Sequence, residues 1–353
     1  MAIQLADFSW AVMVPKSTSK MMIKFLLVLL ISLSTVLAEG NACNPMDLKG
    51  LTDFKAAIHN DIGNRLASWV GHRCCMWKGI TCDNRTGRVT EINLPASSYG
   101  ARLEGSLSAS VTLISFLQVL DIGGNPGLVG EIPQSLGSLK NLFRLSLVSN
   151  RLSGSIPESV ASLTNLVFLD LRNNSLTGHI PQRIGQLQAL LDFDVSRNRL
   201  SGKLPPSMAN LSSVVTIWLH NNFFEGPIPV LKMPSLKLLL LANNSLTGSI
   251  PTNFGDLIAL REVNLSNNKL EGAIPESLGN LSMLLVLELQ QNRFSGKIPD
   301  EFLKLGNLEE LNLSNNHLVG KIPEGKPLSD FPKSSYSGNT GLCGKPLTPC
   351  KPI

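Results

Sequence analysis

Leucines recur along most of this chain in one fixed pattern of apolar and polar positions. The segment LTNLVFLDLRNNSLTGHIPQRIGQ and the later segment LIALREVNLSNNKLEGAIPESLGN both obey LxxLxLxxNxLxGxIP. The pattern occurs nine times, with prolines 24 residues apart except for Pro229 and Pro251, which are 22 apart. A degenerate copy precedes them, from Val89 to Gly105. A fixed period of this length predicts a repeat architecture.

Each position of the repeat has a physical task. The alternating leucines of LxL predict a short strand with one side facing inward, and stacked copies would pair these strands into a parallel sheet. A buried asparagine can hydrogen-bond the backbone of neighbouring turns, which predicts a ladder. Glycine permits the tight return, and proline after isoleucine holds an extended backbone on the far side. The ladder positions are Asn125, Asn150, Asn174, Asn198, Asn222, Asn244, Asn268, Asn292 and Asn316.

The pattern therefore predicts an α/β fold, a right-handed solenoid in which repeats contact only their neighbours. A parallel β-sheet lines its concave face, and short helical, 3-10 and extended segments form its convex side. Such a stack needs a cap at each end. We expect an N-terminal extension and signal peptide at residues 1–38, an N-terminal cap at 39–88, the solenoid of one degenerate and nine regular repeats at 89–326, and a C-terminal cysteine cap at 327–353.

Cysteines occur only near the two predicted caps, and a helical pattern at Leu48, Leu51, Phe54 and Ile58 precedes most of the first group. In a secreted chain, this arrangement predicts disulfides at both ends. The sequence leaves three pairings open among the first four cysteines, or two if the adjacent pair does not bridge. The cysteines are Cys43, Cys74, Cys75, Cys82, Cys343 and Cys350.

Secretion is predicted from the segment that follows Lys24. An apolar run begins at Phe25, and Val36-Leu37-Ala38 fits a signal-peptidase site, while the run is too short for a membrane span. The formal charge of +5 falls to +3 once residues 1–38 are removed, and the chain contains no basic block. Nucleic acid is therefore not an expected partner.

The ends of the repeat region carry a specific family resemblance. The run LTDFKAAIHNDIGNRLASWVGHRCCMWKGITCDNRTGRVTEINLP resembles the N-terminal cap of plant leucine-rich-repeat proteins, LxGxIP is similar to their plant-specific repeat, and SGNTGLCGKPLTPC resembles the C-terminal cap of plant receptor-like proteins and kinases. The resemblance implies the disulfides Cys43–Cys74, Cys75–Cys82 and Cys343–Cys350. Only Lys351, Pro352 and Ile353 follow the last cap, so we expect similarity to soluble members such as polygalacturonase-inhibiting proteins. The alternative is the ectodomain of a membrane receptor-like protein or kinase whose gene model is truncated.

Catalytic chemistry is not apparent in the sequence. The histidines lie in different repeats or caps and form no HExxH or GxSxG motif, so we expect neither an enzyme nor a bound cofactor or metal. The outward strand positions instead predict a binding surface. Trp218, Leu238 and Leu240 would form one exposed apolar patch within an acidic surround. The expected partner-binding residues are Phe168, Asp170, Asp192, Asp194, Trp218, His220, Leu238 and Leu240.

N-glycosylation is predicted from seven Asn-x-Ser/Thr sequons, at Asn84, Asn173, Asn210, Asn243, Asn264, Asn280 and Asn312. Together these features predict a secreted glycoprotein of the apoplast or cell wall. We expect it to bind an extracellular protein or peptide, or a membrane receptor kinase, through its concave face. The resemblance implies a role in plant defence or cell-wall signalling, as an inhibitor or a receptor partner.

Overall fold

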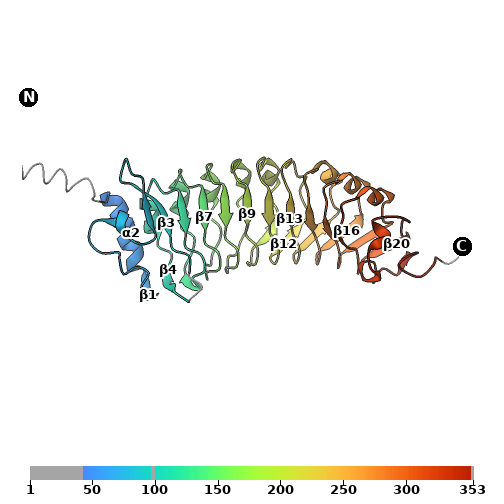
Figure 1. Ribbon diagram of the computed structural model, residues 1–353, viewed down its shortest axis with the longest axis horizontal. Helices are drawn as coiled ribbons and strands as arrows, with labels where there is room; N and C mark the ends of the chain where they lie inside the picture. The colour runs from blue at the N-terminus through green and yellow to red at the C-terminus, as the bar shows by residue number, and fades with distance from the viewer. Residues whose placement is uncertain (1–42, 97–99, 351–353) are drawn as a thin grey trace, which may run out of the picture.

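The computed structural model describes residues 43–96 and 100–350 as one elongated stack, with the N-terminal cap at one end and the C-terminal cap at the other (Figure 1). The predicted signal peptide lies outside the described residues. In the described part of the chain, no helix has the length and apolar content that a membrane crossing requires.

A large parallel sheet runs along the whole stack, as the LxL pattern predicts. From β5 to β19 the central residue of each strand is buried in the core, while its two neighbours lie on the outward side of the sheet. Strand β2 pairs antiparallel with β3 and closes the N-terminal edge of the sheet. In the described residues the strands are β2 (Ile80–Cys82), β3 (Val89–Asn93), β5 (Val119–Asp121), β7 (Arg144–Ser146), β8 (Phe168–Asp170), β9 (Asp192–Asp194), β11 (Thr216–Trp218), β13 (Leu238–Leu240), β15 (Glu262–Asn264), β17 (Val286–Glu288) and β19 (Glu310–Asn312).

A second parallel sheet follows the asparagine turns, where the prediction had only extended segments. Each xLxG segment pairs with the same segment of the next repeat, because the fixed period brings both into register. Its strands are β10 (Ser201–Lys203), β12 (Phe223–Gly226), β14 (Ser245–Gly248), β16 (Lys269–Ala273), β18 (Arg293–Gly296), β20 (His317–Lys321) and β21 (Gly341–Cys343). A small sheet covers the first repeats and contains β1 (Ile58–Ile62), β4 (Arg102–Ser106) and β6 (Gly127–Val129).

Short 3-10 helices form the third side of most repeats. Most begin directly after the repeat proline, whose extended backbone (φ −63° and ψ 136° at Pro133) sets their start. They are η2 (Ala109–Leu113), η3 (Gln134–Ser138), η4 (Glu158–Ser162), η5 (Ile184–Gln186), η6 (Pro206–Asn210), η7 (Thr252–Asp256), η8 (Glu276–Asn280) and η9 (Asp300–Lys304). The repeat between η6 and η7 has no such helix.

The asparagine ladder lies beneath the turns as predicted. Asn198 Nδ2 donates to the carbonyl oxygens of Leu171 (3.0 Å) and Val195 (3.1 Å), and its Oδ1 accepts from the Leu176 N–H (3.1 Å). Each amide thus joins its own turn to the previous repeat. The ladder has a further member that the repeat pattern did not predict, Asn339 of the C-terminal cap, whose Oδ1 accepts from the Leu318 N–H in the same way.

The N-terminal cap is built on helix α2 (Pro45–Ala56), with η1 (Cys74–Met76) beside it. The expected helical pattern is correct up to Phe54, but Ile58 is wrong as a helical residue because it begins β1, which pairs with β4. Asp47 of α2 is fully buried and accepts from Arg88 Nε and Nη2, both at 2.8 Å, and from the Val89 N–H. This ion pair joins the cap to the first repeat.

The C-terminal cap covers the other end with η10 (Leu328–Asp330) and η11 (Lys333–Ser335). The carbonyl oxygens of Ser335 and Ser337 accept from the Leu313 and Asn315 N–H groups, which satisfies the free edge next to β19. The disulfides are Cys43–Cys74, Cys75–Cys82 and Cys343–Cys350, the pairs that the resemblance implied.

Candidate functional site: the open face of the large sheet

The solvent side of the large sheet presents side chains of varied chemistry along the stack, and we call it the open face. Its residues flank the buried centre of each strand or lie two positions beyond. They are Arg144, Ser146, Phe168, Asp170, Arg172, Asp192, Asp194, Ser196, Thr216, Trp218, His220, Leu238, Leu240, Glu262, Asn264, Ser266, Val286, Glu288, Gln290, Glu310, Asn312 and Ser314.

The predicted partner-binding residues lie together on this face, on four adjacent strands from β8 to β13. One row across the strands contains Phe168, Asp192 and Leu238 in register. The next row contains Asp170, Asp194, Trp218 and Leu240. His220 follows Trp218 by two residues, and their rings are 6.0 Å apart.

The apolar part of this surface is smaller than predicted. Trp218 and Leu238 are half-buried and present part of their side chains to solvent. The prediction that Leu240 is exposed is wrong, since only 8% of it is accessible. The reason is its register, because Leu240 lies between Trp218 and Asn264 on the two neighbouring strands. The apolar anchor therefore consists of the two partly exposed side chains of Trp218 and Leu238.

The acidic part is also more internal than predicted. Asp194 is only 4% exposed, so it is not a free surface carboxylate. It accepts from the Ser196 N–H and Oγ, and Arg172 Nη1 lies 3.3 Å from its other oxygen. The same guanidinium lies 3.6 Å from Asp170. Arg172 is not among the predicted partner-binding residues, yet it lies at the centre of this cluster.

Asp170 is the most perturbed acid of the open face. Burial raises the pKa of Asp170 to about 6, and the nearby carboxylates Asp194 and Asp192 add to this rise. The Arg172 backbone N–H and guanidinium act in the opposite direction. Burial thus raises the pKa of Asp170 while the ion pair lowers it. The effect of burial is larger, because the Arg172 side chain is about half exposed and its charge is screened by solvent.

Two buried polar atoms of the open face have no hydrogen-bond partner among the described residues. They are His220 Nδ1 and Gln290 Oε1. Burial also lowers the pKa of His220, which favours its neutral ring. Buried polar groups are normally paired, so these two atoms mark positions where the hydrogen bonding of the open face is incomplete.

On the open face, the late repeats carry three acids, Glu262, Glu288 and Glu310, that make no ion pair in the described residues. Burial, followed by repulsion from Glu288 and Glu310, raises the pKa of Glu262. The sequon residues Asn264 and Asn312 are half-buried here, and each accepts from the N–H and Oγ of the serine two residues later. The other predicted glycosylation sites, Asn84, Asn173, Asn210, Asn243 and Asn280, are exposed.

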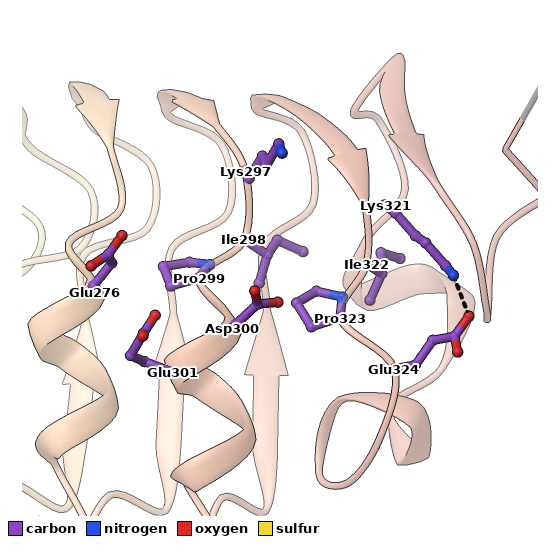
Figure 2. Close-up of a pocket in the computed structure, with 10 residues that line it drawn as sticks. All are labelled: Glu276, Lys297, Ile298, Pro299, Asp300, Glu301, Lys321, Ile322, Pro323 and Glu324. Atoms are coloured by element: carbon purple, nitrogen blue, oxygen red, sulfur yellow. Dashed lines mark ion pairs between the residues drawn. The ribbon is translucent and has the colours of Figure 1, made fainter. Parts of the chain in front are cut away.

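A groove of about 470 Å³ lies away from the open face, between the Ile-Pro turns of the last repeats (Figure 2). Its inner wall contains Ile298 and Ile322, and Lys321 Nζ lies 2.6 Å from Glu324 Oε1. Its lining contains two lysines and four acids, so it carries charges of both signs. The charged lining residues are Glu276, Lys297, Asp300, Glu301, Lys321 and Glu324.

The sulfur atoms of Cys74, Cys75 and Cys82 form the only group of potential metal ligands in the described residues. All three are bonded in disulfides, so they offer no thiolate to an ion.

The family models that match this chain are all models of leucine-rich repeats or of their N-terminal domain. A leucine-rich-repeat N-terminal domain model matches residues 44–83, and leucine-rich-repeat models match residues 141–163, 165–187, 189–211, 235–257 and 258–318. Receptor-like protein EIX2 of Solanum lycopersicum is 39% identical over 119 residues, which is 31% of this chain and 12% of that protein. A polygalacturonase inhibitor of Pyrus communis is 35% identical over 111 residues, or 31% of this chain and 32% of that protein. These alignments thus span at most about a third of either relative.

Solved structures extend the likeness to most of the chain. A plant ice-binding protein is 31% identical with a TM-score of 0.73, covering 88% of this chain and 99% of that one. The ectodomain of the receptor kinase GASSHO1/SCHENGEN3 from Arabidopsis thaliana, solved in complex with CASPARIAN STRIP INTEGRITY FACTOR 2, is 36% identical with a TM-score of 0.74. That alignment covers 78% of this chain and 33% of the ectodomain.

Proposed function

Because this chain belongs to the leucine-rich-repeat family, alongside plant receptor-like proteins and polygalacturonase inhibitors, we propose that it is a secreted recognition protein. It binds an extracellular protein or peptide through its open face and acts in plant defence or cell-wall signalling, without catalysis. The observation that carries this proposal is the partly exposed pair Trp218 and Leu238 beside the Asp170–Arg172–Asp194 cluster. An apolar anchor beside charged groups is a common interface layout.

The decisive test first identifies a partner by pull-down from extracellular fluid and then measures its binding to two variants. Trp218→Ala should weaken binding by about 2 kcal/mol, since tryptophan is enriched among interface anchors. Its unfolding midpoint should stay nearly unchanged, because Trp218 is partly exposed on the outward side of the sheet and is not one of the core residues. The matched control is Gln182→Ala, at an exposed position beyond the repeat proline. Unchanged kinetics for Trp218→Ala, with lost binding for Gln182→Ala, would move the site off the open face.

Two other roles follow from the relatives. In the first, the chain is the ectodomain of a longer membrane receptor, and a transcript that continues past Ile353 into an apolar span would establish it. In the second, it binds ice, as the plant ice-binding protein does. We do not favour ice binding, because the exposed positions of the second sheet include the charged side chains of Lys269, Glu271 and Arg293, and the ammonium group of Lys269 is strongly hydrated.

A further inference from the structure

The outward side of the second sheet carries an excess of positive charge, and we call it the basic face. In each repeat its residues stand one, three and five positions after the ladder asparagine, around the buried leucine or phenylalanine of the xLxG segment. From the repeat of Asn150 to that of Asn292, these positions contain six exposed cations but only two exposed acids, Glu225 and Glu271. The cations are Arg151, Arg199, Lys203, Lys269, Arg293 and Lys297.

None of these six cations forms an ion pair within the part of the chain that the structure describes. In the repeat that follows them, by contrast, Lys321 pairs with Glu324. The sequence contains no basic block, but the repeat period brings cations from distant segments to one side of the stack. Like charges that are not neutralised repel one another and attract an anion, so the basic face favours a negatively charged partner.

The repeat glycines leave room for the lysine side chains on this face. Lys203 lies against Gly226 of the next repeat, where an added Cβ would stand 2.9 Å from the lysine Cγ. Lys297 lies against Gly320 in the same way, with a corresponding distance of 3.2 Å. Both glycines have a positive φ, which a larger residue would adopt only with strain. The lysine stems therefore pack along the sheet, and their ammonium groups stay in solvent.

Two further kinds of side chain lie among the cations. Phe223 pairs in register with Ser201 and is 61% exposed. An exposed aromatic ring can pack on the apolar C–H face of a sugar ring, and hydroxyl side chains can donate to and accept from sugar hydroxyls. Hydroxyl residues occupy most of the remaining positions of the basic face, namely Ser153, Ser155, Ser175, Thr177, Ser201, Ser245, Thr247, Ser249 and Ser295.

The distribution of these groups indicates an extended partner. The cations are spread over six repeat steps, which span at least about 29 Å at the usual strand spacing of about 4.8 Å. Arginine guanidinium groups match carboxylates in a two-pronged geometry, so carboxylates are the preferred anions. The open face would repel such a partner, because Glu262, Glu288 and Glu310 there have no ion pair in the described residues.

We propose that the basic face binds a linear acidic polysaccharide whose sugars carry carboxylates, a polyuronate, laid along the stack. Its carboxylates pair with the cations, among them Arg199 and Lys203, and one of its sugar rings packs on Phe223. The serine and threonine hydroxyls between them bind the sugar hydroxyls. This site uses neither the open face nor the protein partner proposed for that face, so the chain can hold both at once.

The test titrates the full chain with oligomers of galacturonic acid and of mannuronic acid, followed by isothermal titration calorimetry. Oligomers of about twelve sugars should bind at least about tenfold more tightly than those of about four, because each further carboxylate meets a cation already held near it. Complete methyl esterification removes the charge but keeps the sugar chain, and it should abolish binding. Raising the salt from about 0.01 M to about 1 M, which shortens the Debye length from about 30 Å to about 3 Å, should do the same.

Variants assign this binding to the basic face. Arg199→Gln with Lys203→Gln should weaken binding of the longer oligomers about three- to thirtyfold, the range expected for two exposed charge pairs. The matched control is Arg183→Gln with Lys304→Gln, which removes two exposed cations on the side of the 3-10 helices and should change the affinity by less than about twofold. Phe223→Ala should weaken binding about threefold or more, because the sugar ring loses its aromatic contact.

Polyglutamate of the same length separates a sugar partner from an acidic protein segment. It should bind more weakly than the uronates, and Phe223→Ala should leave its affinity unchanged, since it has no sugar ring. Tighter binding of polyglutamate would overturn the proposal in favour of an acidic protein. No binding of either uronate, equal binding of the methyl esters, or equal losses in the control pair would also overturn it. Trp218→Ala should leave uronate binding intact, so failure here and failure of the open-face proposal are distinguishable.

Discussion

Polar groups beneath the repeats and caps differ from those on the open face in how completely they are paired. In the interior, Asp47 has three donors and Asn198 uses both its amide nitrogen and its oxygen. On the open face, His220 Nδ1 and Gln290 Oε1 are buried without a partner. The acid Asp170 there has a raised pKa despite its neighbour Arg172.

This difference follows from repetition. Inside the stack every repeat presents the same groups at the same height, so one satisfied arrangement can be copied along the chain. The outward strand positions take no part in these repeated hydrogen bonds, and their residue types change from repeat to repeat. Their bonds are incomplete where neighbours do not match, as they are next to Trp218. The regular interior stabilises the molecule, and the irregular face is available for recognition.

The strongest way to break the interior is to remove Asp47. We expect Asp47→Ala to lower the free energy of unfolding by about 3–5 kcal/mol, because it leaves the Arg88 guanidinium without its buried partner and the Val89 N–H without an acceptor. Denaturant unfolding measures the loss. The control on the same helix is Asp53→Ala, which breaks an exposed pair with Lys49 and should cost under about 0.5 kcal/mol. Similar losses in the two variants would show that the cap does not depend on the buried pair.

The ladder should give the next largest effect. Asn198→Ala and Asn268→Ala should each cost about 1–3 kcal/mol, since backbone groups of two repeats lose their partners. Asn339→Ala should cost a similar amount, because the C-terminal cap uses the same arrangement. Asn60, which only contacts the Glu104 side chain at the surface, is the control and should cost far less on change to alanine. If the denaturant midpoint of Asn339→Ala equals that of the Asn60 variant, the ladder stabilises the repeats but not the C-terminal cap.

The sequence predicts best those features of the fold that depend on the repeat period. The strands and ladder positions follow from the period, because identical groups recur one repeat apart. Asn339 was missed since its spacing in NTGLCG is one residue longer, although NPGLVG after Asn125 shows the same spacing and was a usable signal. The second sheet follows from the same period, but the LxG segment alone does not indicate pairing.

The sequence predicts where the residues of the site lie on the sheet, but not how exposed each of them is. The strand positions of Trp218, Leu240 and Asp194 follow directly from the repeat. Their burial depends on the length and charge of the side chains one repeat away, such as Asn264 beside Leu240 and Arg172 beside Asp194. A pattern that treats all outward positions as equivalent cannot contain this information.

The smallest expected effect is a change of stability with pH that arises from Asp170. It tests whether the polar groups of the open face are less completely paired than those of the interior. The pKa of Asp170 is about 6 in the folded chain against 3.8 ordinarily, so the folded state binds the proton more tightly. Stability from this group is therefore greatest at low pH and is lost as pH rises from about 4 through 6. Asp170→Asn keeps an acceptor for the Arg172 N–H and should stabilise the chain at pH 7 by up to about 1 kcal/mol after allowance for screening. That gain should vanish near pH 4, as measured by denaturant unfolding of both proteins. If Asp170→Asn instead destabilises the chain at pH 7, the ion pair with Arg172 outweighs burial, and the open face is as well paired at this point as the interior.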